Sequence, residues 1–94
     1  MKKGKLKERN NWESLSYTFD GEPIKAKDIS KVLVRWPDKK ETAEEAQSVK
    51  RTESYSDHGH TSTVTSDELR VLLKMNGQTI NVPARSLNIV GVEA

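Results

Sequence analysis

Asp57, His58 and His60 form a group of neighbouring side chains with the chemistry of metal ligands. Two imidazoles and a carboxylate can hold zinc, or iron in a facial triad. On a strand, His58 and His60 would share one face, because side chains repeat every two residues. However, Gly59 favours a bend, and a metal site normally takes a ligand from a distant part of the chain. We therefore predict a polar turn and no metal, with a metal site at these three residues as the alternative.

Catalytic chemistry is not indicated. A histidine base needs a nucleophile and an orienting group within reach, and the hydroxyls near His58 (Ser54, Ser56 and Ser62) offer no single choice. The chain has no glycine-rich phosphate loop, nucleophile elbow or paired-carboxylate pattern. We therefore expect no catalytic residues, no cofactor and no enzymatic activity.

Cations are concentrated at the N-terminus. Residues 1–9 carry five cations and one carboxylate, a net charge of +4, so the remainder of a chain with net charge +2 stands at −2. Such cations can contact phosphates and make nucleic-acid binding salt-dependent. The nucleic-acid candidates are Lys2, Lys3, Lys5, Lys7, Arg9 and Arg35. Because Leu6 is the sole apolar side chain of residues 1–11 after Met1, we predict a disordered arm there and a β domain over 12–94.

The clearest fold signal is the dipeptide Asn76-Gly77 between two apolar runs. Asn-Gly is typical of the type I′ turn, in which both central residues have positive φ. A two-residue turn here places Leu73 opposite Ile80, and the next apolar pair, Val71 and Val82, matches as well. A slip of one residue would separate both pairs. The sequence therefore predicts an antiparallel hairpin.

Several other segments read as short strands and turns. Ser16–Phe19 is rich in β-formers and is followed by the turn dipeptide Asp20-Gly21. Lys31–Trp36 has apolar side chains on one face. Pro83–Ser86 predicts a tight or 3₁₀ turn, and Leu87–Val92 predicts a closing strand.

Residues 42–50 allow either a short helix or an exposed strand. A capping-box pattern at Thr42–Glu45 and apolar side chains at helical spacing favour the helix. A strand returning from the preceding turn would instead place Ala43 opposite Val34. Both interpretations stay open here.

Residues 51–68 are polar and β-prone. Thr alternates with other small residues over 61–65, which is typical of an extended edge strand, and 57–60 would connect two polar strands. Such an edge can accept a partner's strand, although the charges around it could equally prevent that pairing. From Ser66 onward, the alternative to the hairpin at Asn76-Gly77 is a helix with Ser66 as its N-cap and Gly77 just after its C-terminus.

About five short antiparallel strands with tight turns predict a mainly β, single-domain barrel or roll, with a possible helix at 42–50. The order of hairpin, short turn and final strand is similar in outline to an SH3-like barrel. The predicted core residues are Val32, Val34, Trp36, Val71, Leu73, Ile80, Val82, Leu87 and Ile89.

Composition places further bounds on the protein. With 94 residues, 33% hydrophobic and 5% aromatic, the core is thin. The absence of cysteine excludes disulfides, thiolate nucleophiles and Cys-based zinc sites, and favours a reducing compartment. No signal-peptide pattern and no apolar stretch of roughly 18 residues occurs. We expect a cytoplasmic protein without a membrane partner.

These observations favour a non-enzymatic binding module, an adaptor or regulator that contacts another protein, as in a phage or mobile-element accessory protein. The alternatives are a nucleic-acid-binding β domain and a metal site at 57–60. The partner-binding candidates are Trp12, Arg51, Tyr55, His58 and His60. The sequence leaves the oligomeric state open.

Overall fold

The structure is a computed structural model that describes residues 1–11 and 14–94. Its elements are β1 (Lys2–Lys3), β2 (Leu6–Asn11), β3 (Ser14–Phe19), β4 (Glu22–Ile24), η1 (Ala26–Asp28), β5 (Lys31–Arg35), β6 (Glu41–Asp57), β7 (His60–Met75), β8 (Gln78–Pro83), η2 (Ala84–Ser86) and β9 (Ile89–Glu93). Strands dominate, and no α-helix occurs in the described part of the chain. None of these elements is therefore an apolar helix of membrane-spanning length.

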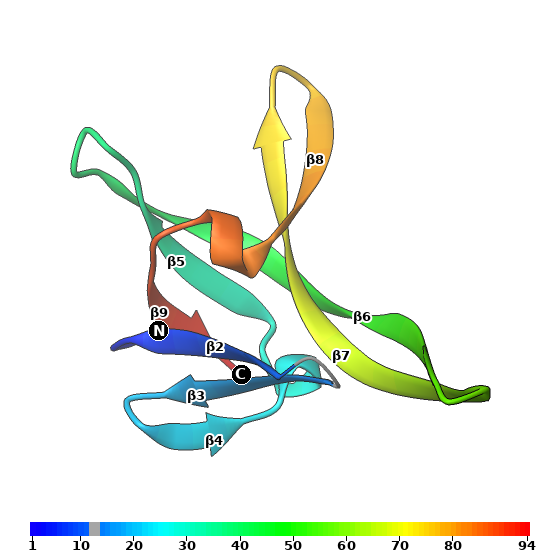
Figure 1. Cartoon of the computed structure of the whole chain (residues 1–94). Helices are drawn as coiled ribbons and strands as arrows, with labels where there is room; N and C mark the ends of the chain where they lie inside the picture. Colours follow the sequence, from blue (N-terminus) through cyan, green and yellow to red (C-terminus); the bar gives the residue numbers. More distant parts are fainter. Residues whose placement is uncertain (12–13) are drawn as a thin grey trace.

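Two antiparallel sheets make up the fold (Figure 1). The large sheet has the strand order β1-β9-β5-β6-β7-β8, and the small sheet has the order β2-β3-β4. The large sheet curls, and the small sheet packs on it through Tyr17 and Phe19 of β3. The predicted fold class, a mainly β barrel or roll, is confirmed. Two strands are much longer than predicted, since β6 has 17 residues and β7 has 16.

The predicted β7–β8 hairpin is confirmed in type and register. Leu73 pairs with Ile80 and Val71 pairs with Val82. The turn residues Asn76 and Gly77 have φ values of 53° and 78°, as a type I′ turn requires. The alternative helix starting at Ser66 is wrong.

Two more hairpins close on the same kind of turn. Asp20 and Gly21, between β3 and β4, have φ values of 52° and 82°. His58 and Gly59, between β6 and β7, have φ values of 50° and 80°. The predicted connection at 57–60 is therefore a two-residue turn that joins two long strands, and each of the three glycines supplies a positive φ that other residues adopt at a cost.

Residues 42–50 are strand, so the helical interpretation is wrong. They belong to β6, which pairs with β5 and then with β7. Ala43 lies opposite Leu33, and Val34 lies opposite Thr42, one residue from the predicted register. The turn after Trp36 sets this register, because the N–H of Trp36 donates to the carbonyl of Lys40 at 2.8 Å.

The N-terminal residues are also strand, where the sequence predicted a disordered arm over 1–11. β1 pairs with β9, and β2 pairs along its length with β3. Leu6 packs against the core, and Glu8 accepts a hydrogen bond from the Tyr17 hydroxyl at 2.9 Å. Backbone pairing and these two inward side chains order a segment whose composition alone is typical of disorder.

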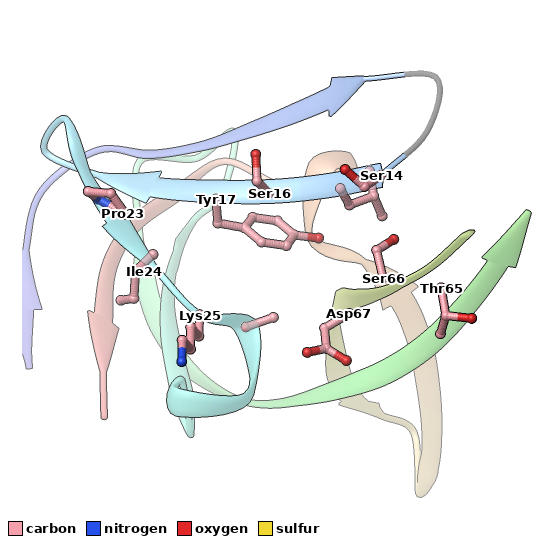
Figure 2. A pocket seen from close by; sticks show the side chains of 11 residues that line it. Ser14, Ser16, Tyr17, Pro23, Ile24, Lys25, Thr65, Ser66 and Asp67 are labelled. Carbon is pink, nitrogen blue, oxygen red and sulfur yellow. The ribbon is translucent and has the colours of Figure 1, made fainter. Parts of the chain in front are cut away.

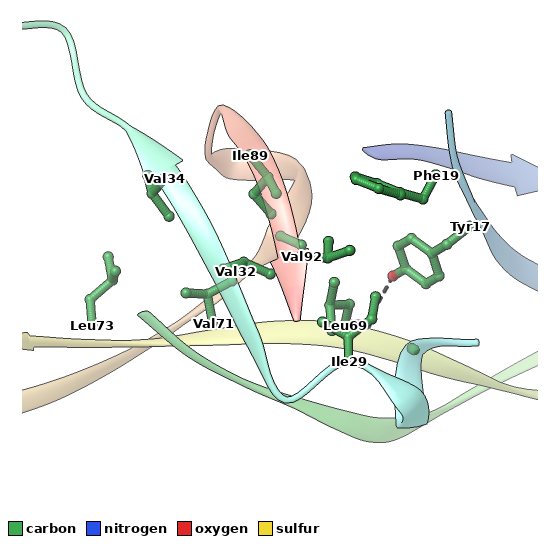
Figure 3. Packing of buried hydrophobic residues seen from close by; sticks show 12 residues of the cluster. Tyr17, Phe19, Ile29, Val32, Val34, Leu69, Val71, Leu73, Ile89 and Val92 are labelled. Carbon is green, nitrogen blue, oxygen red and sulfur yellow. Dashed lines mark hydrogen bonds between the residues drawn. The ribbon is translucent and has the colours of Figure 1, made fainter. Parts of the chain in front are cut away.

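The core lies between the two sheets (Figure 3). The predicted residues Val32, Val34, Val71, Leu73 and Ile89 are buried there. The prediction from the sequence did not include further residues that are buried in the structure. They lie mainly on β3, η1, β7 and β9 and are Leu15, Tyr17, Phe19, Ala26, Ile29, Leu69, Ala84 and Val92.

Four of the predicted core residues are not fully buried. Trp36, Val82 and Leu87 are partly buried against the cluster, and Ile80 is 42% exposed, so its predicted burial is wrong. A cleft of about 320 Å³ lies between the β5–β6 turn and the outer part of β7. The β7–β8 hairpin reaches past the end of the core there, and Met75 and Ile80 therefore remain exposed to solvent.

The turn geometry predicts unequal effects of two matched substitutions. Gly77→Val should lower the free energy of unfolding by at least about 1 kcal/mol, because a β-branched residue tolerates positive φ poorly. Gly59→Val introduces the same strain at a turn that is remote from the core, where local fraying can relieve it. Urea unfolding of both variants measures the difference, and equal losses of stability would contradict this account.

Candidate functional site

A two-stranded ribbon, defined as residues 48–57 of β6 and 60–67 of β7, projects from the sheet (Figure 1). β5 pairs with β6 only as far as Glu45, and β8 pairs with β7 only from Arg70. Beyond those points the two strands pair only with each other, in one unbroken register from Glu45↔Leu72 to Asp57↔His60. None of the ribbon's side chains is fully buried. The molecule is elongated, with dimensions of 50 × 33 × 22 Å.

One face of the ribbon is a ladder of hydroxyl groups. Three cross-strand pairs of β-hydroxyl residues follow one another along it, with oxygen–oxygen distances of 3.4 to 3.5 Å. Such pairs stabilise antiparallel strands modestly. The hydroxyl face consists of Thr52, Ser54 and Ser56 opposite Thr65, Thr63 and Thr61.

The opposite face, which we call the mixed face, carries three of the predicted partner-binding residues. Arg51, Tyr55 and His60 share it, because side chains two or four residues apart on a strand lie on one face and paired residues do so as well. His58 lies in the turn and is exposed. The structure thus brings three of the five candidates onto one face of the ribbon and the fourth, His58, into the turn at its end, whereas Trp12 lies outside the described residues.

At the base of the ribbon, Glu68 is the centre of an ion-pair cluster. Its carboxylate is buried, and it accepts hydrogen bonds from Arg70 at 2.8 Å and from Arg85 at 3.1 Å. Arg51 of the ribbon lies 3.5 Å from the same carboxylate and also pairs with Glu53. Buried carboxylates of this kind need such partners to offset the loss of hydration.

A neighbouring hydrogen-bond chain ties the small sheet to β7 (Figure 3). The Tyr17 hydroxyl accepts a bond from the backbone N–H of Leu69 at 2.9 Å and donates to Glu8 at 2.9 Å. Arg85 lies 3.3 Å from that Glu8 carboxylate. Burial, above all, raises the pKa of the Tyr17 phenol, so this hydroxyl stays protonated and acts as a fixed structural link.

Glu68 and Asp67 remain ionised at neutral pH, because the pKa of each is lowered. Burial raises the pKa of Glu68. The hydrogen bonds and charges of Arg70 and Arg85 together lower this pKa by more than burial raises it, so the net shift is downward. The Glu68 contact in turn raises the pKa of the Arg85 guanidinium. A hydrogen bond from Lys50 lowers the pKa of Asp67 at the ribbon's base.

A groove of about 470 Å³ opens beside the base of the ribbon, between β3–β4 and β7 (Figure 2). Figure 2 shows Tyr17 on one side of this groove, and Ser66 and Asp67 on the other. Lys25 and Asp67 give its wall one cation and one carboxylate.

The metal candidates do not form a binding set in the structure. Asp57 and His58 approach each other to 3.4 Å, and both side chains are exposed. No group of three His, Asp or Glu side chains among residues 1–11 and 14–94 is arranged to hold a metal ion.

The nucleic-acid candidates differ in their contacts with other side chains. Lys3 and Arg35 both pair with Glu41, at 3.2 and 2.7 Å, and these contacts lower the Glu41 pKa, with Arg35 contributing most. Lys2 lies 5.8 Å from the centre of the Phe19 ring. The remaining cations, Lys5, Lys7 and Arg9, are exposed.

Comparison with protein-family models, with curated proteins and with solved structures found no match to this chain. Sequence reasoning missed Glu8, Tyr17, Glu68 and Arg85 as a cluster. Their positions span most of the chain, and only the contact between the two sheets brings them together. The alternation of Glu68 and Arg70 on one strand was the one local signal.

Glu68→Gln tests the cluster. A carboxylate whose folded pKa is lowered stabilises the fold above its unfolded pKa of about 4.5, and this contribution is lost as pH falls through the folded value. At pH 7 we expect the variant to lose about 1–3 kcal/mol of unfolding free energy, and the difference should shrink on acidification. Urea unfolding across this range, with the exposed-strand control Glu22→Gln, measures it. A difference that persists unchanged into acid would contradict the assignment.

Proposed function

We propose that this protein is a non-enzymatic binding module, an adaptor or regulator, and that the projecting ribbon is its contact element for another protein. The observation that supports this most is the ribbon itself, a long two-stranded element along whose edges no strand of residues 1–11 or 14–94 pairs. An isolated two-stranded hairpin is at best marginally stable in water. Its retention in a chain with so thin a core supports a role in contact rather than in folding.

The charge of the ribbon favours a protein over a nucleic acid. Residues 48–67 contain two cations and three carboxylates, with both histidines counted as neutral. A protein surface that binds nucleic acid instead needs an excess of cations. Arg and Tyr are enriched at protein interfaces, and Arg51 and Tyr55 share the mixed face of the ribbon.

Nucleic-acid binding by the small sheet is a second candidate function. Along β2 and the residue before it, exposed cations alternate with inward side chains: Lys5, Lys7 and Arg9 are exposed, while Leu6 and Glu8 point inward. A row of cations at every second residue suits contact with successive phosphates. The SH3-like outline, the cytoplasmic location and the phage or mobile-element origin remain predictions from the sequence.

A register-preserving deletion tests the proposed function. Arg51 and Ser66 face each other in the ribbon, so replacing Thr52–Thr65 by Asn-Gly joins them through a tight turn. We expect the thermal midpoint to stay within a few degrees, because no deleted side chain is fully buried. Proteins captured by the full chain from its native host should be lost by the shortened chain.

A matched control is the double variant Lys7→Ser and Arg9→Ser, which leaves the ribbon intact and should retain the captured protein. If the shortened chain folds and captures the same protein, the ribbon is not the contact element. If instead nucleic acid is captured, with affinity that falls steeply with salt and is lost in the double variant, the second candidate is the function.

A further inference from the structure

The backbone of the ribbon has a defined outward side on each strand. The N–H of Leu69 points away from β6, because it donates to the Tyr17 hydroxyl, and the N–H of Ala46 points away from β7, because it donates to Ser30. Hydrogen-bonding direction alternates along antiparallel strands, and the β6–β7 register has no shift. The open edge of β7 therefore presents the N–H and C=O groups of Thr61, Thr63 and Thr65.

The two edges of the ribbon differ in how they are protected. Exposed edges normally carry charged side chains that discourage pairing with other chains. On β6 the charges are present, at Lys50, Arg51, Glu53 and Asp57. On β7, residues 61–66 are Thr, Ser and Val without a charge, glycine or proline, a composition that favours strand pairing.

The β7 edge is complementary to itself. If it pairs antiparallel about Thr63, Thr63 lies opposite Thr63 of a second copy, and Thr61 lies opposite its Thr65. On the mixed face, Ser62 then lies opposite Val64 of that copy, and His60 lies opposite its Ser66. No carboxylate meets a carboxylate and no cation meets a cation in this arrangement, and the hydroxyl ladder continues from one copy to the next.

A groove lined by residues of the described part of the chain offers space beside this edge. The edge is closed at Leu69, where Tyr17 occupies the hydrogen-bonding position, but a register about Thr63 needs only residues 60–66. The turn of the second copy would then lie beside Asp67, at the groove of about 470 Å³ that Thr65, Ser66 and Asp67 line with Ser14 and Leu15. The groove therefore lies where the incoming turn needs space.

We propose that two copies of this chain associate through the β7 edges of their ribbons, antiparallel and symmetric about Thr63, to form one four-stranded intermolecular sheet. This proposal is independent of the proposed function, since it concerns one edge of the ribbon and leaves the mixed face and the β6 edge accessible. Strand addition of this kind takes its affinity from main-chain hydrogen bonds.

Paired proline variants test which edge associates. Thr63→Pro removes an outward N–H from the β7 edge, and Ser54→Pro removes one from the β6 edge at the residue directly opposite. Light scattering after size exclusion should give a concentration-dependent mass that rises from 10.6 kDa towards twice that value for the wild-type chain. Thr63→Pro should raise the dimer dissociation constant at least about tenfold, and Ser54→Pro should leave it unchanged, with circular dichroism confirming that both fold.

A cysteine variant tests the register. The chain contains no cysteine, so the introduced thiol is the sole site for disulfide formation. Directly opposed, hydrogen-bonded residues have Cα atoms about 5.5 Å apart, within the range for a disulfide. Thr63→Cys should therefore give a covalent dimer under mild oxidation, whereas Ser54→Cys should remain largely uncrosslinked. A wild-type chain that stays monomeric at all concentrations, or equal behaviour of the two edges in either pair of variants, would overturn the proposal.

Discussion

The backbone N–H of Leu69 sets the constraint around which the molecule is organised. Leu69 is fully buried and lies between the ribbon, where β7 pairs only with β6, and the segment from Arg70 that also pairs with β8. A buried N–H without a partner costs free energy comparable to a lost hydrogen bond. The Tyr17 hydroxyl supplies that partner and so fixes the small sheet on the large one, while Glu68 and its arginines close the same junction from the polar side.

This junction divides long β7 into two parts with different roles. On one side, Leu69, Val71 and Leu73 pack into the core with β5 and β9. On the other side, the strand continues as a polar ribbon that is stabilised by its partner strand, its hydroxyl ladder and the ion pairs of Lys50 and Arg51. A thin core thus supports an element that reaches well beyond it, and that element is where contact with other molecules can occur without disturbing the fold.

The sequence predicted what depends on neighbours in the chain. Asn76-Gly77 and the matched apolar pairs gave the β7–β8 register, because turn type and alternation are local. The arm over 1–11 was wrongly expected to be disordered, because its order comes from pairing with β3 and β9. Ile80 was wrongly placed in the core, since alternation gives the face of a strand but not how far the core extends along it. The Glu68 cluster depends on contacts between the two sheets and could not be predicted from spacing.

Amide hydrogen exchange of the dilute protein tests the central claim that Leu69 marks the boundary between a stable core and an independent ribbon. We predict that the Leu69 amide exchanges only through global unfolding, whereas the cross-strand amides of Arg51 and Tyr55 exchange through local opening of the ribbon at much lower free energy. The protection profile along β7 should therefore step down sharply from Leu69 towards His60. Protection at Tyr55 equal to that at Leu69 would show that the ribbon belongs to the core and would contradict this account.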